Sequence, residues 1–245
     1  MNKQADTLAG KVAVITGAGR GIGRAIALAY ARAGAAVVCS ARSRNEIDET
    51  AALVAAGGGT ASACVADVGS YTAMQALFQH AVDVHGGVDI VVANAGVWGQ
   101  ARTVADSDPA HWAQTIHVNL LGAFHTAHAA IPHLRARGAG KIIFMGSGAR
   151  HSTALGMSAY SASKLALWKL TQVLAMELQE HRISVNELIP GPVKTAMTAD
   201  FGQHAFAPSE WIKEPDDVVP MAMFLATQPD IGPTAQSYSL MRRAG

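Results

Sequence analysis

The sequence predicts an α/β fold in which one doubly wound parallel sheet carries helices on both faces. Short runs rich in Val and Ile alternate along the chain with longer segments of helical periodicity. The runs lack the apolar–polar alternation of a strand with one wet face, which indicates burial on both sides. Because no Pro- or Ser-rich linker and no internal repeat interrupts this order, residues 1–245 are expected to form a single domain.

The expected strands and helices follow one another in order. The first strand is the apolar run KVAVIT at 11–16, and the helix IGRAIALAYARAG that comes after it stops at Gly34. The second strand, AAVVCSA, is followed by a helix that ends in a glycine run. Strands are expected at 11–16, 35–41, 61–67, 88–96, 141–147 and 183–191, and the later helices at 46–58 and around 70–85, 109–137 and 158–180.

The composition argues against a disordered, nucleic-acid-binding, secreted or membrane protein. Half of the 245 residues are hydrophobic and 15% are charged, so the chain can bury a substantial core and disorder is not expected. The net charge of +1 gives no general attraction to nucleic acid or to a membrane surface. Cys39 and Cys64 lack CxxC spacing, the polar N-terminus has no signal core, and no run approaches the roughly 18 apolar residues of a membrane span. A soluble cytoplasmic protein is expected.

The stretch TGAGRGIG, residues 16–23, joins the first expected strand to the first expected helix. Its four glycines allow backbone amides to approach a bound diphosphate, and the helix N-terminus supplies partial positive charge there. The spacing differs from GxGxxG, and a tight glycine turn without a ligand is the alternative. The position of the loop between strand and helix favours a nucleotide site.

Tyr160 and Lys164 stand four residues apart in the helical segment 158–180, so they share one helix face. A tyrosine with a pKa of about 10 must shift down by roughly 3 units, or about 4 kcal/mol, to act as an acid–base at neutral pH. An ammonium at about 4 Å supplies about that much at an effective dielectric near 20. The pair is suited to moving a proton on or off a ketone or alcohol oxygen, which Ser147 is expected to hydrogen-bond. An ordinary surface pair is the alternative.

A series of motifs resembles the short-chain dehydrogenase/reductase family, and their order and spacing carry the resemblance. The serine precedes the tyrosine by thirteen residues, and the tyrosine precedes the lysine by four. The motifs are TGAGRGIG, NAG at 94–96, Asn119 in VNLLGAF, Ser147, YSASK at 160–164 and PGPVKT at 190–195. The resemblance runs from about residue 8 to about residue 230. It implies a Rossmann-like fold with a cofactor half at about 8–145, a catalytic and substrate half at about 146–245, and a lid at about 196–212.

The resemblance also implies residue roles. The implied catalytic residues are Asn119, Ser147, Tyr160 and Lys164. Asn119 would take part in a proton relay with Lys164, Thr195 would hold the nicotinamide carboxamide, and Asp67 would meet the adenine amino group unless it only caps its strand. The implied cofactor-binding residues are Gly17, Arg20, Gly21, Ile22, Gly23, Ser40, Arg42, Asp67, Val68, Asn94, Gly96, Tyr160, Lys164, Pro190, Gly191, Val193 and Thr195.

The end of the second strand predicts which dinucleotide is preferred. NAD-preferring members of the family carry an acidic residue there for the ribose 2′-hydroxyl, whereas this chain has Arg42. Arg42 offers a planar fork suited to a 2′-phosphate, Arg20 lies close to it in the family fold, and Ser40 adds a hydroxyl. NADP(H) is the expected cofactor. NAD(H) is the alternative, in which both arginines are solvated and Glu46 or Asp48 reaches the ribose.

The substrate is less well defined by the sequence. Trp98 after the NAG motif, with Phe201, Phe206 and Trp211 in the expected lid, favours an apolar or ring-bearing carbonyl compound. Lid packing or a subunit contact is an equal alternative for these aromatic residues. The expected substrate-contacting residues are Ser147, Tyr160, Trp98 and His151.

Three functions are consistent with these residues. The favoured one is an NADP(H)-dependent oxidoreductase that interconverts a ketone and a secondary alcohol, with Tyr160 as the acid–base. A 3-oxoacyl-[acyl-carrier-protein] reductase is the main alternative, in which Arg135, Arg137 and Arg182 meet an acidic carrier. The other is a non-catalytic NADP-sensing regulator on the same fold, which has no need of an acid–base pair.

The sequence predicts a homo-oligomer without a metal site. His125, His128 and His133 lie on one helical segment without a cysteine or carboxylate at ligand spacing. The run ALWKLTQVLAMEL is more apolar than one buried stripe requires, and the family pairs its subunits through the helices at 109–137 and 158–180. A homotetramer is expected, with a dimer as the alternative; a nucleic-acid or membrane partner is not.

Overall fold

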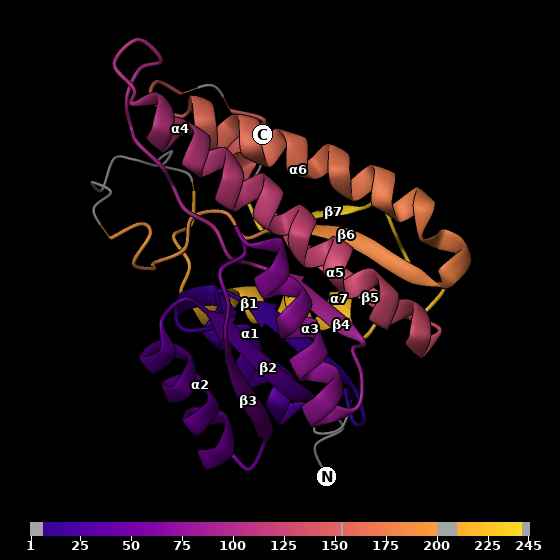
Figure 1. Cartoon of the computed structure of the whole chain (residues 1–245). Helices are drawn as coiled ribbons and strands as arrows, with labels where there is room; N and C mark the ends of the chain where they lie inside the picture. The colour runs from indigo at the N-terminus through magenta and orange to yellow at the C-terminus, as the bar shows by residue number, and fades with distance from the viewer. Residues whose placement is uncertain (1–6, 153, 200–209, 242–245) are drawn as a thin grey trace.

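A seven-stranded parallel sheet forms the centre of the computed structural model, which describes residues 7–152, 154–199 and 210–241 (Figure 1). The strands lie in the order β3-β2-β1-β4-β5-β6-β7, so the winding direction reverses between β1 and β4. In open α/β sheets, ligands bind at such a reversal, outside the carboxyl ends of the strands. The strands are β1 (Val12–Thr16), β2 (Ala36–Ala41), β3 (Thr60–Val65), β4 (Ile90–Ala93), β5 (Gly140–Met145), β6 (Ile183–Ile189) and β7 (Ser237–Ser239).

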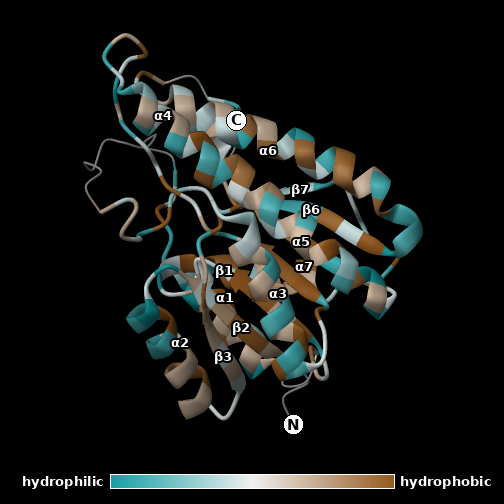
Figure 2. Ribbon diagram, in the orientation of Figure 1, coloured by the Kyte–Doolittle hydropathy of each residue, from teal (hydrophilic) through white to brown (hydrophobic). Residues whose placement is uncertain are grey.

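Helices cover both faces of the sheet, which confirms the predicted doubly wound α/β domain. One core cluster joins α3, α5 and α6 to one face, and a second joins α1, α2 and α7 to the other. The central strands are brown in Figure 2, because their side chains are apolar on both faces. The helices are α1 (Gly21–Arg32), α2 (Arg44–Ala56), α3 (Tyr71–His85), α4 (Pro109–Ile116), α5 (Gly122–Arg137), α6 (Ser158–Glu177) and α7 (Val219–Ala226).

The burial of the strands explains why their sequences do not alternate. Every residue of β1, β4, β5 and β6 is buried, whereas the edge strands β3 and β7 are partly exposed. A strand packed on both faces is mostly apolar along its length, and the exceptions in β5 and β6 are the buried polar residues Lys141, Ser184, Asn186 and Glu187. Within the described part of the chain, none of the helices combines the length and the apolar character needed to cross a membrane.

The segment expected to be one helix at 109–137 contains a wider turn. Between α4 and α5 lies η1 (His117–Leu121), a five-residue π-helical stretch that holds Asn119. Single π turns within α-helices are frequent at functional sites. Short 3₁₀ turns occur at η2 (Gly148–Arg150), η3 (Gln179–His181) and η4 (Pro215–Val218).

Candidate active site

At two positions of the glycine loop between β1 and α1, the backbone has a conformation that only glycine adopts without strain. Gly17 and Gly21 have φ values of +66° and +55°, in the left-handed region. A Cβ built at Gly23 would lie 2.3 Å from the carbonyl oxygen of Gly17, so the loop must fold tightly onto the first turn of α1. The amides at the start of α1 thereby face the carboxyl edge of the sheet, where a diphosphate can be bound. The residues present fit the phosphate group of a dinucleotide.

Asn94 braces this loop from the end of β4. Its Nδ2 donates to the carbonyl oxygens of Thr16 (2.9 Å) and Gly17 (3.2 Å), and its backbone N–H donates to Thr16 Oγ1 (3.1 Å). A Cβ built at Gly17 would lie 2.8 Å from Nδ2 of Asn94. The NAG motif therefore ends β4 and fixes the shape of the glycine loop across the sheet reversal.

The segment after β6 passes over the same loop. A Cβ built at Gly21 would lie 3.2 Å from Cγ2 of Thr195, which places Thr195 directly against the start of α1. Gly191 turns the chain with a φ of +70°, and Val193 is buried and forms a bridge with Lys213. The structure thus brings the PGPVKT segment, from Pro190 on, to the glycine loop.

Asp67 and Val68 follow β3 on the other side of β1. Asp67 is exposed and its Oδ1 accepts from the N–H of Gly69 at 2.9 Å, which is the local capping role that was the alternative. His125 of α5 donates from Nδ1 to the carbonyl oxygen of Val68 at 3.0 Å. His125 thereby anchors a segment that the sequence assigned to the adenine, a role that the sequence analysis missed.

Three of the four predicted catalytic side chains meet at the carboxyl ends of β4 and β5. Ser147 and Tyr160 share a side-chain hydrogen bond. The Lys164 ammonium donates to the carbonyl oxygen of Met145 at 2.8 Å and lies 5.7 Å from the centroid of the Tyr160 ring. Lys164 is buried, so its charge acts in a region with little water.

Asn119 lies next to this group. Its side chain accepts from the N–H of Val97 (2.8 Å) and donates to the carbonyl oxygen of Val97 (2.9 Å) and to Ser163 Oγ (3.2 Å). A Cβ at Gly96 would lie 3.2 Å from Asn119 Oδ1 and 3.9 Å from Lys164 Nζ. The absence of a side chain at Gly96 therefore leaves space between the π-helical turn and Lys164.

The pKa values of Tyr160 and Lys164 differ from the expectation drawn from the sequence. Burial raises the pKa of the Tyr160 phenol, and the hydrogen bond with Ser147 only partly offsets this. Burial lowers the pKa of Lys164 to about 8, and the charge of Glu187 opposes that change. The downward shift of the Tyr160 pKa that the sequence predicts is not found, because burial outweighs the neighbouring Lys164 ammonium, which lies 5.7 Å from the ring centroid and donates to Met145.

The expected substrate residues are only partly brought together. The indole of Trp98 packs on the ring of Tyr160, with centroids 4.5 Å apart and planes tilted by 37°. His151 is exposed, and within the described residues its side chain makes no hydrogen bond or ion pair. Trp211 contacts Lys213, whose Nζ lies 4.8 Å from the ring centroid. Phe201 and Phe206, in the expected lid, lie outside the described residues.

The residues expected to select the cofactor differ in their exposure and in their hydrogen-bond and ion-pair partners. Arg42 is exposed and makes no hydrogen bond or ion pair with the described part of the chain. Arg20 forms an ion pair with Glu46, with Nη1 and Oε1 3.3 Å apart. The hydroxyl of Ser40 is buried and has no hydrogen-bond partner among the described residues. The exposed, unpaired guanidinium of Arg42 fits a ribose phosphate, whereas the hydroxyl of Ser40 is buried and Glu46 competes for Arg20.

Two buried charges that the sequence analysis did not predict lie beside the end of β5, where Glu187 contacts Gly146. Glu187 of β6 and Arg150 of η2 form an ion pair with side chains that are 0% and 5% exposed. The available signal was a glutamate within ISVNELI, a segment expected to be a buried strand. Among the described residues, no group of three or more His, Cys, Asp or Glu side chains is arranged to hold a metal ion. The histidines of α5 instead contact Val68, Tyr71 and Phe78.

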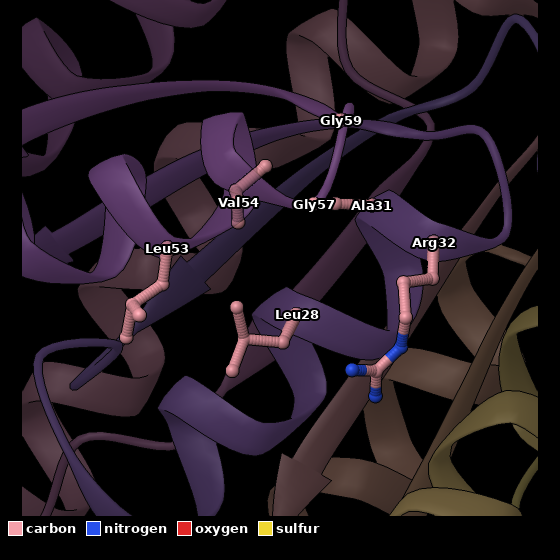
Figure 3. Close-up of a pocket in the computed structure, with 7 residues that line it drawn as sticks. All are labelled: Leu28, Ala31, Arg32, Leu53, Val54, Gly57 and Gly59. Atoms are coloured by element: carbon pink, nitrogen blue, oxygen red, sulfur yellow. The ribbon is translucent and has the colours of Figure 1, made fainter.

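A small cavity lies at the opposite edge of the sheet, between the ends of α1 and α2 (Figure 3). Its volume is about 50 Å³, and its lining is mostly apolar. It is lined by Leu28, Ala31, Arg32, Leu53, Val54, Gly57 and Gly59. Since both helices run back from the carboxyl edge, this cavity is remote from the glycine loop and from Tyr160.

The fold is that of a dinucleotide-binding oxidoreductase family, and the chain belongs to this family, the short-chain dehydrogenases/reductases. The family model for short chain dehydrogenases matches residues 11–205. Enzymes of this family use NAD(P)(H), act on small molecules and are commonly oligomeric.

Individual relatives have a range of names. The human dehydrogenase/reductase SDR family member 4 is 37% identical over 193 residues, which cover 79% of this chain and 69% of that protein. The 7alpha-hydroxysteroid dehydrogenase of Escherichia coli K12 is 33% identical over 227 residues, covering 90% and 88%. The crystal structure of a 3-ketoacyl-ACP reductase from Sinorhizobium meliloti 1021 superposes with a TM-score of 0.85 at 36% identity, covering 94% and 96%.

Proposed function

We propose that this protein is an NADP(H)-dependent oxidoreductase that interconverts a ketone and a secondary alcohol. The observation that carries the proposal is the arrangement of Ser147, Tyr160 and Lys164 at the sheet edge, beside the glycine loop. When bound, the nicotinamide dinucleotide supplies or accepts the hydride. The protein's own residues must then hold the carbonyl oxygen and move one proton.

Tyr160 carries that proton. In reduction, its phenol donates to the oxygen of the forming alcohol, and Ser147, already hydrogen-bonded to the phenol, holds the same oxygen. Burial keeps the phenol protonated, which suits the role of acid in this direction. Lys164 supplies a positive charge that stabilises the phenolate left behind, and Asn119 holds the NAG segment beside Lys164 through Val97. The assignment of Asn119 to a proton relay belongs to this proposal.

The preference for NADP(H) rests on the end of β2. The exposed, unpaired guanidinium of Arg42 is the group best suited to a 2′-phosphate. Glu46 is already paired with Arg20, so a ribose hydroxyl would have to compete for its carboxylate. These contacts favour NADP(H) over NAD(H).

The substrate we propose is a free carbonyl compound with an apolar or ring-bearing body. Trp98 places an aromatic face against Tyr160, where such a body would pack. The relative named as a hydroxysteroid dehydrogenase supports a ring-bearing substrate. His151 and the segment at about 196–212 are proposed to complete the substrate side of the site.

A 3-oxoacyl-[acyl-carrier-protein] reductase is the second candidate, because a neighbour with that name shares the fold at 36% identity. Two of the three arginines expected to meet an acidic carrier are engaged elsewhere. Arg137 donates from Nε and Nη2 to the carboxylate of Asp89, and Arg182 donates from Nε to the carbonyl oxygen of Gly138. Because these arginines are already bonded within the protein, they are less suited to bind an acidic carrier protein than the sequence suggested. We therefore favour free ketones as substrates.

Turnover of two substrate types distinguishes these candidates from each other and from an NADP-sensing regulator. Oxidation of NADPH is followed by absorbance with a panel of free cyclic ketones and with a 3-oxoacyl thioester on its carrier protein. We expect higher kcat/KM with a free ketone. A preference for the carrier-linked thioester would support the second candidate, and cofactor binding without turnover of any substrate would support the regulator.

We further propose that the protein assembles as a homotetramer, with a dimer as the alternative. Large apolar side chains are exposed on α6 and at the start of α5, including Leu165 and Met176 at 56% and 76% exposure. A groove of about 420 Å³ on the adjoining α4–η1 face is lined by Trp112, Ile116 and Leu121, among others. A second copy of the chain would cover these surfaces.

A further inference from the structure

A buried cluster ties together four elements around Ser147 and Lys164. Arg150 Nη2 and Glu187 Oε2 are 3.1 Å apart. Ser237 of β7 joins them, because its hydroxyl accepts from Arg150 Nη2 (2.9 Å) and donates to Glu187 Oε2 (2.7 Å). The Arg150 guanidinium lies over the ring of Trp168 on α6, 4.3 Å from its centroid. The cluster therefore links η2, β6, β7 and α6.

Stability alone is a weak reason for such a pair. Nε and Nη1 of Arg150 and Oε1 of Glu187 are buried without a hydrogen-bond partner among the described residues. Replacing a buried ion pair by apolar side chains of similar volume is often neutral or stabilising. An effect on the neighbouring catalytic groups is a better explanation of the two charges.

The unpartnered oxygen of Glu187 faces the strand end that holds Lys164. A Cβ built at Gly146 would lie 2.2 Å from Glu187 Oε1, so the carboxylate packs directly against Gly146. The preceding residue, Met145, supplies the carbonyl oxygen that accepts from Lys164 Nζ. The charges interact in both directions: Glu187 raises the pKa of Lys164, and Lys164 is one of the groups that lower the pKa of Glu187, which burial raises.

Other titratable groups on the elements around β6 lie at the amino ends of strands, on the surface or against other side chains. Lys141 lies at the amino end of β5, Tyr238 packs against Phe224 of α7, and Lys169 and Glu177 are exposed. The residues of η3 precede the amino end of β6, and α7 contains no titratable residue. The titratable groups on the elements packed against Glu187 are Arg150, Tyr160, Lys164, Lys169, Glu177, Lys141, Tyr238, Glu180 and His181.

We propose that Glu187 is a positioning residue that gives the Lys164 ammonium a fixed, buried counter-charge, with Arg150 and Ser237 holding the carboxylate in place. The proposal rests on the acid–base function proposed above for Tyr160 and Lys164. Without the carboxylate, the Lys164 ammonium loses an attractive charge in a buried region, so its pKa must fall further. Lys164 would then be neutral over more of the range in which the enzyme works.

The direct test is a titration of Lys164 in the cofactor-free full-length protein. The ¹³Cε resonance of Lys164, assigned by its loss in Lys164→Ala, is followed against pH. We expect Glu187→Gln to lower the midpoint by about one pH unit or more. Glu187→Asp should restore most of the shift. Glu177→Gln, which makes the same change at an exposed carboxylate of α6, should leave the midpoint within a few tenths of a unit. An unchanged midpoint in Glu187→Gln overturns the proposal.

The pH profile of ketone reduction gives a second readout. In Glu187→Gln, the alkaline limb of kcat/KM should move to lower pH, in the same direction as the Lys164 midpoint. A uniform loss of activity at every pH, with the limb in place, would show a packing role instead. If Glu187→Gln does not fold, the double variant Arg150→Met with Glu187→Gln removes both charges of the pair. Its Lys164 midpoint should still fall, but by less than in Glu187→Gln, because the repulsive charge of Arg150 is lost as well. A midpoint that does not fall overturns the proposal.

The outcomes separate this proposal from the function on which it rests. Retained turnover in Tyr160→Phe would remove the proposed acid–base function while leaving the Lys164 midpoint open to measurement. An unshifted midpoint in Glu187→Gln, together with an inactive Tyr160→Phe, would remove only the role of Glu187.

Discussion

Lys164 donates to the carbonyl oxygen of Met145 at 2.8 Å and stands 5.7 Å from the centroid of the Tyr160 ring. The lysine is thus fixed to the end of β5 and acts on the phenol as a nearby charge. Its pKa of about 8 lies far closer to neutral pH than that of an exposed lysine. Whether it is charged therefore depends on pH within the working range of an enzyme.

Cofactor binding should weaken as the pH rises through about 8. Above that pH the buried Lys164 ammonium loses its proton, and with it the charge that would hold a ribose hydroxyl. Lys164→Ala should weaken NADPH binding by about ten- to a hundredfold at pH 7 and remove this pH dependence. The dissociation constant is measured by fluorescence titration, with the exposed Lys169→Ala as control. A dependence that survives in Lys164→Ala would assign it to another group.

Reversing the charge at Arg42 should change the choice of cofactor. In Arg42→Asp, the ratio of kcat/KM for NADPH to that for NADH should fall by about ten- to a hundredfold, because a charge-assisted contact to the 2′-phosphate is lost. Arg32→Asp makes the same charge change at the opposite edge of the sheet and should leave the ratio unaltered. If Arg42→Asp does not move the ratio, or if the unmodified protein prefers NADH, the assignment of NADP(H) is wrong.

A methyl group at Gly23 should damage the glycine loop. The new Cβ would lie 2.3 Å from the Gly17 carbonyl oxygen, which is backbone and cannot move alone. Gly23→Ala should cost about 1–3 kcal/mol of unfolding free energy and abolish tight NADPH binding. At Gly57 the nearest atom would be 3.4 Å away, so Gly57→Ala should change stability by no more than about 0.5 kcal/mol. Denaturant unfolding of both variants compares them, and equal stabilities would contradict the geometry.

Charges on the exposed apolar positions of α6 should disrupt the assembly. Leu165→Glu with Met176→Glu should shift the molar mass from that of a tetramer to a smaller species, because a desolvated carboxylate disfavours a subunit contact. Light scattering at micromolar concentration measures this, with Leu155→Glu, at a residue 94% exposed, as control. A monomer for the unmodified protein would refute the proposed assembly.

The sequence predicted the parts of the fold in which every residue of an element has the same surroundings, such as a strand buried on both faces. Buried central strands read as unbroken apolar runs, and the left-handed Gly17 and Gly21 could be recognised in TGAGRGIG. Two elements gave no such signal. The strand β7 is only three residues long, and α7 is apolar all round, so neither has a distinctive period.

The site was predictable as a set of residues but less so as a set of interactions. The position of Asn94 followed from its motif, whereas its bonds to Thr16 and Gly17 depend on which strands lie side by side. The pairing of Glu187 with Arg150 joins residues 37 positions apart across η2 and β6. The pKa values of Tyr160 and Lys164 depend on burial, which spacing along a helix does not report.

The central claim is that Tyr160 moves the proton, and Tyr160→Phe tests it most directly. The variant keeps the ring that packs on Trp98 and removes the only hydroxyl of that side chain. With a free ketone that the unmodified enzyme reduces, NADPH consumption should fall by about two to four orders of magnitude, while NADPH binding by fluorescence stays near normal. Near-normal turnover by Tyr160→Phe, with binding intact, would contradict the account.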